Sequence, residues 1–384
     1  MKFAHTADNH LGYRQYNLLE REQDFYDSFN EMIDKIIEER VDFVIHSGDL
    51  FESPKPSIKT LLEALRGLKR LKEKGIDVYA IPGNHDMSMH KGSLSPHMLF
   101  KDMIRFIGGE EKFCTRGDVF IGGAGYYSRC YSNALVGEMN SLSGAAEGYG
   151  TRILMLHQGF DRYLPFEGSF ELKIGDLPDN FDYYALGHIH KRIKTDYGRG
   201  KLVYPGSTEI WNIDEYGDYK RNGKGFYVVD MSGEEPGVEP INLEGLRTFI
   251  KDKFHVMELS ERINDIKNNV IQLKNRSMKK PVLYLNISGK AYDMPAVHNK
   301  INSFLEDDIL SLRSSYSYEH EGHVLSEMSL DRFDIPDLIG ESFGNESEAN
   351  FATHLFAELS SSNLEGARDS AREFYKEFRS SNSN

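Results

Sequence analysis

Residues 42–51 read Asp-Phe-Val-Ile-His-Ser-Gly-Asp-Leu-Phe. The first half of this stretch, 42–46, is a short apolar run that predicts a strand. It leads into Gly48, which lets the backbone turn sharply, and into the carboxylate of Asp49. In open α/β sheets, ligands bind at the carboxyl ends of the strands. The stretch therefore indicates an α/β sheet with a functional group at a strand end.

Four more predicted strands end in residues of the kinds that bind metal ions. The carboxyl ends of such strands gather at one edge of a sheet, so these groups should converge although they are spread along the chain. The strands and the residues at their ends are Lys2–Ala7 with Asp8-Asn9-His10, Ile76–Ile81 with Pro82-Gly83-Asn84-His85-Asp86, Arg152–His157 with His157, and Tyr183–Gly187 with His188-Ile189-His190.

Helix signals alternate with these strands. Apolar residues recur at helical spacing over 25–37, and 57–74 is predicted as a second helix. Further strands are predicted at Leu202–Tyr204 and Gly225–Asp230. This alternation predicts a layered α/β domain over residues 1–245.

The apolar residues of the predicted helix 57–74 cover about half of its circumference. One side of the helix can face the sheet. The remaining apolar surface, with that around Met98–Ile104, either belongs to one broad core stripe or forms a contact between two copies of the chain. The sequence leaves both interpretations open.

The rest of the chain is organised differently. Residues 232–237 have turn chemistry, and we place a domain boundary at 245. Residues 246–330 combine helix and strand signals and predict a small α+β domain. Residues 331–384 predict a linker followed by two short amphipathic helices. These helices either dock on a partner or fold back on the parent domain as a hairpin.

Composition limits the class of protein. The chain has 384 residues, with 46 Lys+Arg and 60 Asp+Glu, for a net charge of −14. It contains no run of about 18 apolar residues and no secretory signal, so we expect a cytoplasmic protein without a membrane partner. Two cysteines exclude a disulfide framework and a Cys-rich zinc site. An acidic chain is not an obvious partner for DNA, and no Gly-x-x-x-x-Gly-Lys-Ser/Thr motif for ATP occurs.

Seven side chains at the strand ends are of metal-ligand type: Asp8, His10, Asp49, Asn84, His157, His188 and His190. They are too many for one tetrahedral ion and fit two, with Asp49 as the bridge because a carboxylate has two oxygens. Imidazole, carboxylate and amide ligands without thiolate suit Mn(II), Fe(II) or Zn(II). Two ions about 3.5–4 Å apart can activate water and stabilise a leaving oxygen at phosphorus. A lone histidine at a strand end is more often packed than ligating, so the prediction depends on the whole set.

Together the five groups resemble the motifs of the calcineurin-like metallophosphoesterases. The stretches His10-Leu11-Gly12-Tyr13, Ser47-Gly48-Asp49-Leu50-Phe51 and Pro205-Gly206-Ser207-Thr208-Glu209 resemble the Mre-eleven/SbcD nucleases, the archaeal ones in particular. The resemblance implies a layered β-sandwich flanked by helices. It also implies that residues 246–330 form a DNA-capping domain and that residues 331–384 dock on a Rad-fifty/SbcC-type ABC ATPase.

The resemblance further implies roles for single residues. It assigns Asp8, His10, Asp49 and His190 to one metal ion, and Asp49, Asn84, His157 and His188 to the other. His85 would be the catalytic histidine that assists at the scissile phosphate without binding metal, and imidazole titrates in the right range for this. Asp86 either orients His85 or caps the following turn. Glu52 stands where many relatives have histidine, so no role is carried over to it.

Basic residues beside the motifs are candidates for DNA contact. Arg14 follows the first motif, and Lys191 and Arg192 follow His190. They can hold phosphates, a contact that does not depend on base sequence. A solvated surface is the alternative for each of the three.

The sequence thus predicts a two-metal DNA phosphodiesterase. The resemblance implies Mn(II)-dependent 3′-to-5′ exonuclease and endonuclease action with two Mn(II) ions per chain. It also implies a homodimer that processes DNA double-strand breaks together with the ATPase. Two other functions remain open. The same site can serve a phosphodiesterase for a small substrate, since site geometry does not name the substrate. The chain can also be a scaffold that bridges DNA ends, with catalysis secondary.

Overall fold

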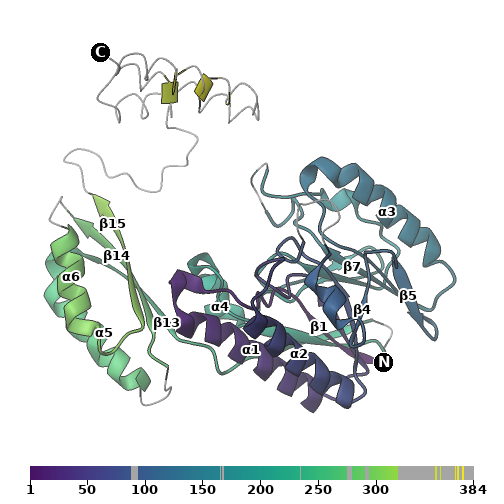
Figure 1. Ribbon diagram of the computed structural model, residues 1–384, viewed down its shortest axis with the longest axis horizontal. Helices are drawn as coiled ribbons and strands as arrows, with labels where there is room; N and C mark the ends of the chain where they lie inside the picture. The colour runs from purple at the N-terminus through teal and green to yellow at the C-terminus, as the bar shows by residue number, and fades with distance from the viewer. Residues whose placement is uncertain are drawn as a thin grey trace. The chain divides into compact units, whose positions relative to one another are not determined.

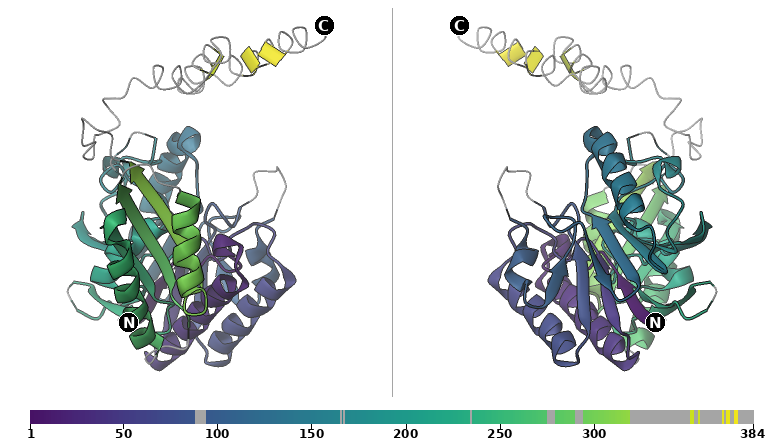
Figure 2. Two further views of the ribbon diagram at one scale, coloured as in Figure 1. Left: turned by 90° about the vertical axis from the view of Figure 1, so that its left-hand side faces the viewer. Right: turned by 90° about the vertical axis from the view of Figure 1, so that its right-hand side faces the viewer.

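The computed structural model describes most of the chain up to residue 318 (Figures 1 and 2). The described residues are 1–87, 94–164, 166, 168–233, 235–274, 279–289, 294–318, 351, 352, 355, 368, 370, 371, 374 and 375. The predicted linker and most of the predicted helices in 331–384 lie outside the described residues. Within the described part, no helix combines the length and the apolarity needed to span a bilayer.

The first sheet has the strand order β12-β11-β1-β2-β3-β4. Strands β1 to β4 run parallel to one another, and β11 and β12 are antiparallel neighbours at one side. The strands are β1 Lys2–Thr6, β2 Phe43–Ser47, β3 Asp77–Ile81, β4 Ile104–Phe106, β11 Gly225–Asp230 and β12 Gly237–Asn242. The helices α1 Leu19–Glu38 and α2 Ile58–Glu73 pack on it through one apolar cluster.

The second sheet has the order β5-β6-β7-β8-β10-β9, with β6, β7, β8 and β10 parallel. Its strands are β5 Phe113–Arg116, β6 Val119–Ala124, β7 Thr151–His157, β8 Tyr183–Gly187, β9 Ile193–Tyr197 and β10 Gly200–Tyr204. Helix α3, Ser132–Ala145, packs on the outer face of this sheet through a second cluster. Helix α4, Tyr216–Asn222, precedes β11. The 3₁₀ turns are Gln15–Asn17, Pro96–Phe100, Arg129–Tyr131, Ile174–Asp176, Ile213–Glu215 and Val256–Glu258.

The two sheets pack face to face through a third apolar cluster. Phe3, Phe43 and Ile45 of the first sheet belong to it together with Ile153 and Tyr183 of the second. Strands such as β2 are buried at every position because a helix covers one face and the other sheet covers the other. The layered β-sandwich flanked by helices, predicted from the resemblance, is confirmed.

Helix α2 begins where Ser57 accepts a hydrogen bond from the Thr60 amide, a regular N-cap. One side of it, with Leu68 and Leu71, is buried. Other apolar residues of this helix are exposed, including Ile58 and Leu62. The broad apolar stripe is therefore only partly used by the core.

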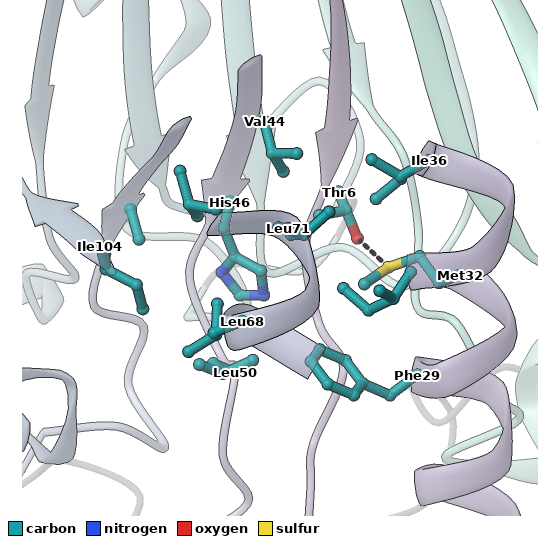
Figure 3. A pocket seen from close by; sticks show the side chains of 13 residues that line it. Thr6, Phe29, Met32, Ile36, Val44, His46, Leu50, Leu68, Leu71 and Ile104 are labelled. Atoms are coloured by element: carbon teal, nitrogen blue, oxygen red, sulfur yellow. Dashed lines mark hydrogen bonds between the residues drawn. The ribbon is translucent and has the colours of Figure 1, made fainter. Parts of the chain in front are cut away.

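A small cavity of about 20 Å³ lies beneath α1 and α2 (Figure 3). Thr6 Oγ1 lies 3.0 Å from Met32 Sδ on its wall. His46 of β2 also lines it, and its Nε2 donates a hydrogen bond to Asn9 Oδ1 at 2.7 Å. Burial lowers the pKa of His46 well below its ordinary value, so this ring is neutral.

The small α+β module has a three-stranded sheet of order β13-β14-β15 with α5 and α6 beside it (Figure 1). The elements are β13 Phe249–His255, α5 Leu259–Lys274, β14 Val282–Gly289, α6 Met294–Leu305 and β15 Ser311–Tyr318. Side chains of β14 alternate between buried and half-buried, the pattern of a strand with one face on a core. The predicted boundaries at 245 and 330 stay predictions.

Candidate metal centre

All seven predicted ligands lie at the carboxyl edges of the two sheets. The first sheet contributes Asp8 and His10 after β1, Asp49 after β2, and Asn84 after β3. The second contributes His157 at the end of β7 and His188 and His190 after β8. The site therefore needs both sheets, and it joins residues that are up to 182 positions apart.

Three of the ligands form a first group. One donor atom from each of Asp8, His10 and His190 lies within 4.8 Å of the others. The Nε2 atoms of His10 and His190 are 3.1 Å apart. Each ring has its Nδ1 on a carboxylate, that of Glu52 for His10 and that of Glu215 for His190, both at 2.8 Å. A carboxylate only accepts hydrogen bonds, so each Nδ1 carries the proton.

The remaining ligands form a second group around His157. Its Nε2 is 3.1 Å from Asp49 Oδ2 and 3.1 Å from Asn84 Oδ1. Its Nδ1 donates to the Ser47 carbonyl at 2.7 Å, which fixes the tautomer. His188 Nδ1 lies 3.1 Å from the same Asn84 oxygen. This group thus presents Nε2 of one imidazole and Nδ1 of the other.

Asp49 lies between the two groups. Its Oδ2 is 3.1 Å from His157 Nε2 and 3.9 Å from His10 Nε2. Its Oδ1 accepts the backbone N–H of His85 at 2.8 Å. Oδ2 is thus the oxygen that lies near both groups, and Oδ1 is hydrogen-bonded to the backbone. The prediction that Asp49 bridges two ions stays a prediction.

The backbone at this edge is held in a strained conformation. Asp8, His10, Asp49 and His188 all have positive φ, between 47° and 90°. Side chains rarely tolerate this region, and such strain clusters at functional sites. Gly48 is required here, since a Cβ on it would lie 2.3 Å from His157 Nδ1.

The donor set fits a pair of metal ions. When both Nδ1 atoms of the first group carry protons, the neutral rings of His10 and His190 point bare nitrogens at each other across 3.1 Å. Two lone pairs in that position repel unless a proton or a cation lies between them. Oxygen and imidazole donors without sulfur suit first-row divalent ions.

Comparison with known proteins identifies the family. Residues 1–192 match the calcineurin-like phosphoesterase family. The chain is 40% identical over 383 residues to the DNA double-strand break repair protein Mre11 of Methanococcus maripaludis, covering 96% of this chain and 97% of the relative. It is 44% identical to the Mre11 protein of Methanocaldococcus jannaschii, covering 71% and 75%, and 31% identical to that of Saccharolobus solfataricus, covering 95% and 96%.

The chain belongs to the Mre11 family. It is a metal-dependent nuclease, a phosphodiester hydrolase. The resemblance to archaeal members and to the metallophosphoesterases is confirmed. The metal centre described above lies within the matched residues, 1–192.

The electrostatics of this Mre11-family site couple its histidines to its carboxylates. Burial would lower the pKa of His157, but the Asp49 carboxylate outweighs it and raises the pKa to about 9. Burial of His190 would lower its pKa, but the Glu215 carboxylate outweighs this effect, so the pKa of His190 is raised. Burial, and then the charge of His157, lower the pKa of His188 to about 3. Metal binding must therefore displace protons, and metal affinity should fall as the pH is lowered.

His85 lies at the open side of the centre, with 27% of its side chain exposed. Its Nδ1 donates to the Glu52 carbonyl at 3.1 Å, and its ring centroid is 4.8 Å from that of His10. Asp86 instead accepts backbone N–H groups of Phe51 and Gly83, both at 2.9 Å. Of its two expected roles, the contacts favour the turn: Asp86 ties together the loops that carry Asp49 and Asn84.

The three basic candidates differ. Arg14 is half exposed and paired with Glu22 at 2.7 Å, and Lys191 is exposed. Arg192 is 9% exposed, and its guanidinium donates to the Asn222 and Ile241 carbonyls at 2.7 and 2.8 Å. Arg192 therefore uses its two terminal guanidinium nitrogens inside the protein, and its contacts give no support to the predicted phosphate contact.

Sequence reasoning missed the partners that hold the ligands. Glu215 receives the Lys224 ammonium, and both side chains are buried. Glu171 lies 3.8 Å from His188 Nε2 and accepts the Gly159 amide at 2.8 Å. Trp211, the single tryptophan of the chain, packs against His10 and His190. None of these residues stands in a motif, so the sequence offered no local signal for them.

Proposed function

We propose that this chain is the nuclease subunit of a DNA double-strand-break processing complex. It would hydrolyse DNA phosphodiester bonds with two Mn(II) ions, as a 3′-to-5′ exonuclease and as an endonuclease. Two relatives named DNA double-strand break repair protein Mre11 match this chain over nearly their whole length. The observation that carries the proposal is the facing pair of Nε2 atoms of His10 and His190, 3.1 Å apart beside the Asp49 group.

Two Mn(II) ions, when bound, supply an activated water and neutralise charge at phosphorus. Asp8, His10, Asp49 and His190 would hold one, and Asp49, Asn84, His157 and His188 the other. With both ring nitrogens protonated, His85 would donate its Nε2 proton to the leaving sugar oxygen and become a neutral imidazole. Its Nδ1 donates to the Glu52 carbonyl, so Nε2 is the nitrogen left for the substrate. At 27%, its side chain is more exposed than those of His188 and His190. We retain Arg14 and Lys191 as candidates for phosphate contact.

The test uses end-labelled double-stranded and single-stranded DNA, with and without Mn(II). We expect Mn(II)-dependent cleavage that His85→Ala abolishes. The control is Glu138→Gln, because Glu138 lies on α3, accepts a hydrogen bond from the Tyr127 hydroxyl and has no part in the proposal. Hydrolysis of nucleotide esters but not of DNA would contradict the proposal and favour a small-substrate phosphodiesterase. Full repair function of a His85→Ala strain would instead favour a scaffold.

We also propose that two copies of the chain form a homodimer through an exposed apolar face of the nuclease domain. Ile58 and Leu62 of α2 are 78% and 45% exposed, and Met98 and Leu99 are 42% and 67% exposed. The Lys72 ammonium donates to the Asp102 carbonyl at 2.9 Å and so ties α2 to the segment that follows Leu99. Exposed apolar residues on α2 and on the turn at 96–100 are candidates for an interaction surface.

The remaining partner is proposed from the family. A Rad-fifty/SbcC-type ABC ATPase would bind residues 331–384, and the complex would act on DNA in the cytoplasm, at the nucleoid. Among the eight described residues of this segment, the rings of Phe351 and Phe374 stack with centroids 4.1 Å apart. Phe351→Asp should abolish co-purification with the ATPase encoded by the same organism and leave DNA cleavage by the free nuclease unchanged.

A further inference from the structure

Glu52 lies where three side chains of the metal centre meet. Its Oε2 is 2.8 Å from His10 Nδ1 and 3.1 Å from the indole Nε1 of Trp211. Its Oε1 is 3.7 Å from His85 Nδ1. A carboxylate only accepts, so the imidazole and the indole both donate to the same oxygen. The Glu52 side chain is 22% exposed, which puts it at the mouth of the site rather than in the core.

The contact with His10 fixes which nitrogen of that ring is free. With the proton held on Nδ1 by Glu52, Nε2 must present its lone pair toward His190. A metal-bound imidazole whose other N–H meets a carboxylate is a more basic and better oriented ligand. Glu215 does the same for His190, so the two histidines of the first group are backed symmetrically.

The second contact fixes Trp211. The indole stacks on Tyr13 at a centroid distance of 5.3 Å and an angle of 24°. Its centroid is 5.7 Å from that of His10 and 5.4 Å from that of His190. An indole N–H that is largely withdrawn from water needs an acceptor. Glu52 supplies it and so links the Trp211 ring to the predicted ligand His10.

We propose that Glu52 is a positioning residue that locks His10 and Trp211 into one unit. It keeps His10 in the tautomer that binds the first metal ion and holds the indole over that ion's histidines. The inference rests on the proposed two-metal function and assigns a role to the position at which many relatives have histidine.

The same atoms permit a different interpretation. One donor atom from each of His10, Glu52 and His85 lies within 4.8 Å of the others, a spacing that could hold a third metal ion. Hydrogen bonding is the better account, because His10 would otherwise have to bind metals through both nitrogens. The indole N–H of Trp211, also aimed at Glu52, is a donor that a cation would displace.

The experiment compares wild type with Glu52→Ala, Glu52→Gln and a control, Glu138→Gln. Glu138 lies on α3, on the outer face of the second sheet, and its side chain is 15% exposed. It accepts a hydrogen bond from the Tyr127 hydroxyl. Free Mn(II) is measured by electron paramagnetic resonance during titration, giving stoichiometry and affinity. The single indole N–H resonance, from Trp211, is followed by ¹⁵N NMR without metal.

We expect wild type and Glu138→Gln each to bind two ions, with the same two affinities in both proteins. Glu52→Ala should weaken one of the two sites by about 10–100-fold and shift the indole resonance. Glu52→Gln keeps an oxygen that can accept from both donors but loses the negative charge, so its affinity should lie between those of wild type and Glu52→Ala. Because Gln keeps the shape of Glu, this variant also guards against a folding defect in the alanine variant.

Three results would overturn the inference. One is a Glu52→Ala protein whose two affinities stay within twofold of wild type. Another is an unchanged indole resonance in that variant. The third is a wild type that binds three ions and a Glu52→Ala protein that binds two, since Glu52 would then be a ligand. Fewer than two ions in wild type would instead overturn the proposed function itself, and the indole resonance would still report the Glu52 contact.

Discussion

Replacing Glu215 with glutamine should destabilise the fold and weaken metal binding together. Glu215 is 5% exposed, and its main charged partner, Lys224, is 2% exposed. One carboxylate oxygen accepts from His190 and the Asn212 amide, and the other accepts from Lys224 and Ser207. Glutamine has a single acceptor oxygen and no charge. The glutamine side chain therefore leaves one of the two pairs of donors without an acceptor. It also leaves the Lys224 ammonium buried without a counter-charge.

Breaking a buried pair by removing one partner costs about 3–5 kcal/mol. We therefore expect Glu215→Gln to lose about that much unfolding free energy, measured by urea denaturation with chelator present. Lys224→Met should be comparably destabilised. The double variant should be more stable than either single variant, because it leaves no unpaired charge. A loss below about 1 kcal/mol in Glu215→Gln would refute the reasoning.

The double variant also separates stability from metal binding. Without the Glu215 carboxylate, the His190 tautomer is no longer fixed, whether or not Lys224 is present. Mn(II) affinity should therefore fall about 10–100-fold in Glu215→Gln and stay low in the double variant. Recovery of affinity along with stability would show that the carboxylate acts only through folding.

Three more outcomes follow from packing and burial. Gly67→Ala puts a Cβ 2.4 Å from Phe29 Cε1, so urea unfolding should show a net loss of about 1–2 kcal/mol despite the helix propensity of alanine. Burial lowers the pKa of His5 to about 3, so protons bind the unfolded chain more readily than the folded one. The free energy of unfolding should therefore fall by about 2 kcal/mol between pH 7 and pH 5. His5→Asn should remove this contribution to the pH dependence of the unfolding free energy. Glutamate at Leu62 and Leu99 together should give monomers in light scattering with an unchanged melting temperature.

The fold was predictable where apolar runs end in glycine and a polar group. Strands β8 and β11 have the predicted bounds, and α2 starts one residue after its predicted start. Strand β6 was missed because its Gly122 and Gly123 weaken the apolar pattern. Helix α3 was also missed, although its buried Leu135, Met139 and Leu142 have helical spacing. That signal was present in the sequence and was overlooked.

The site was predictable as far as its chemistry is local. Each predicted ligand follows a strand within a few residues, so position along the chain was enough. The Glu215 contact joins His190 to a residue 25 positions away in a turn that looks exposed in sequence. The burial of Arg192 depends on carbonyls of residues 222 and 241. Such contacts depend on tertiary packing, which a charge pattern does not encode.

The division of the ligands between two sheets sets the order in which the centre can assemble during synthesis. Asp8 and Asn84 follow β1 and β3, strands of the first sheet that are translated early, whereas His157 and His190 follow strands of the second sheet that are translated later. At about 5–20 residues per second, the ribosome needs roughly 10–35 s to extend the chain from the first ligand to the last. A nascent chain that holds only the first strands has carboxylates and one or two imidazoles, but not the full pair of metal pockets. The hydrolytic centre cannot be complete until the chain has been made at least as far as His190.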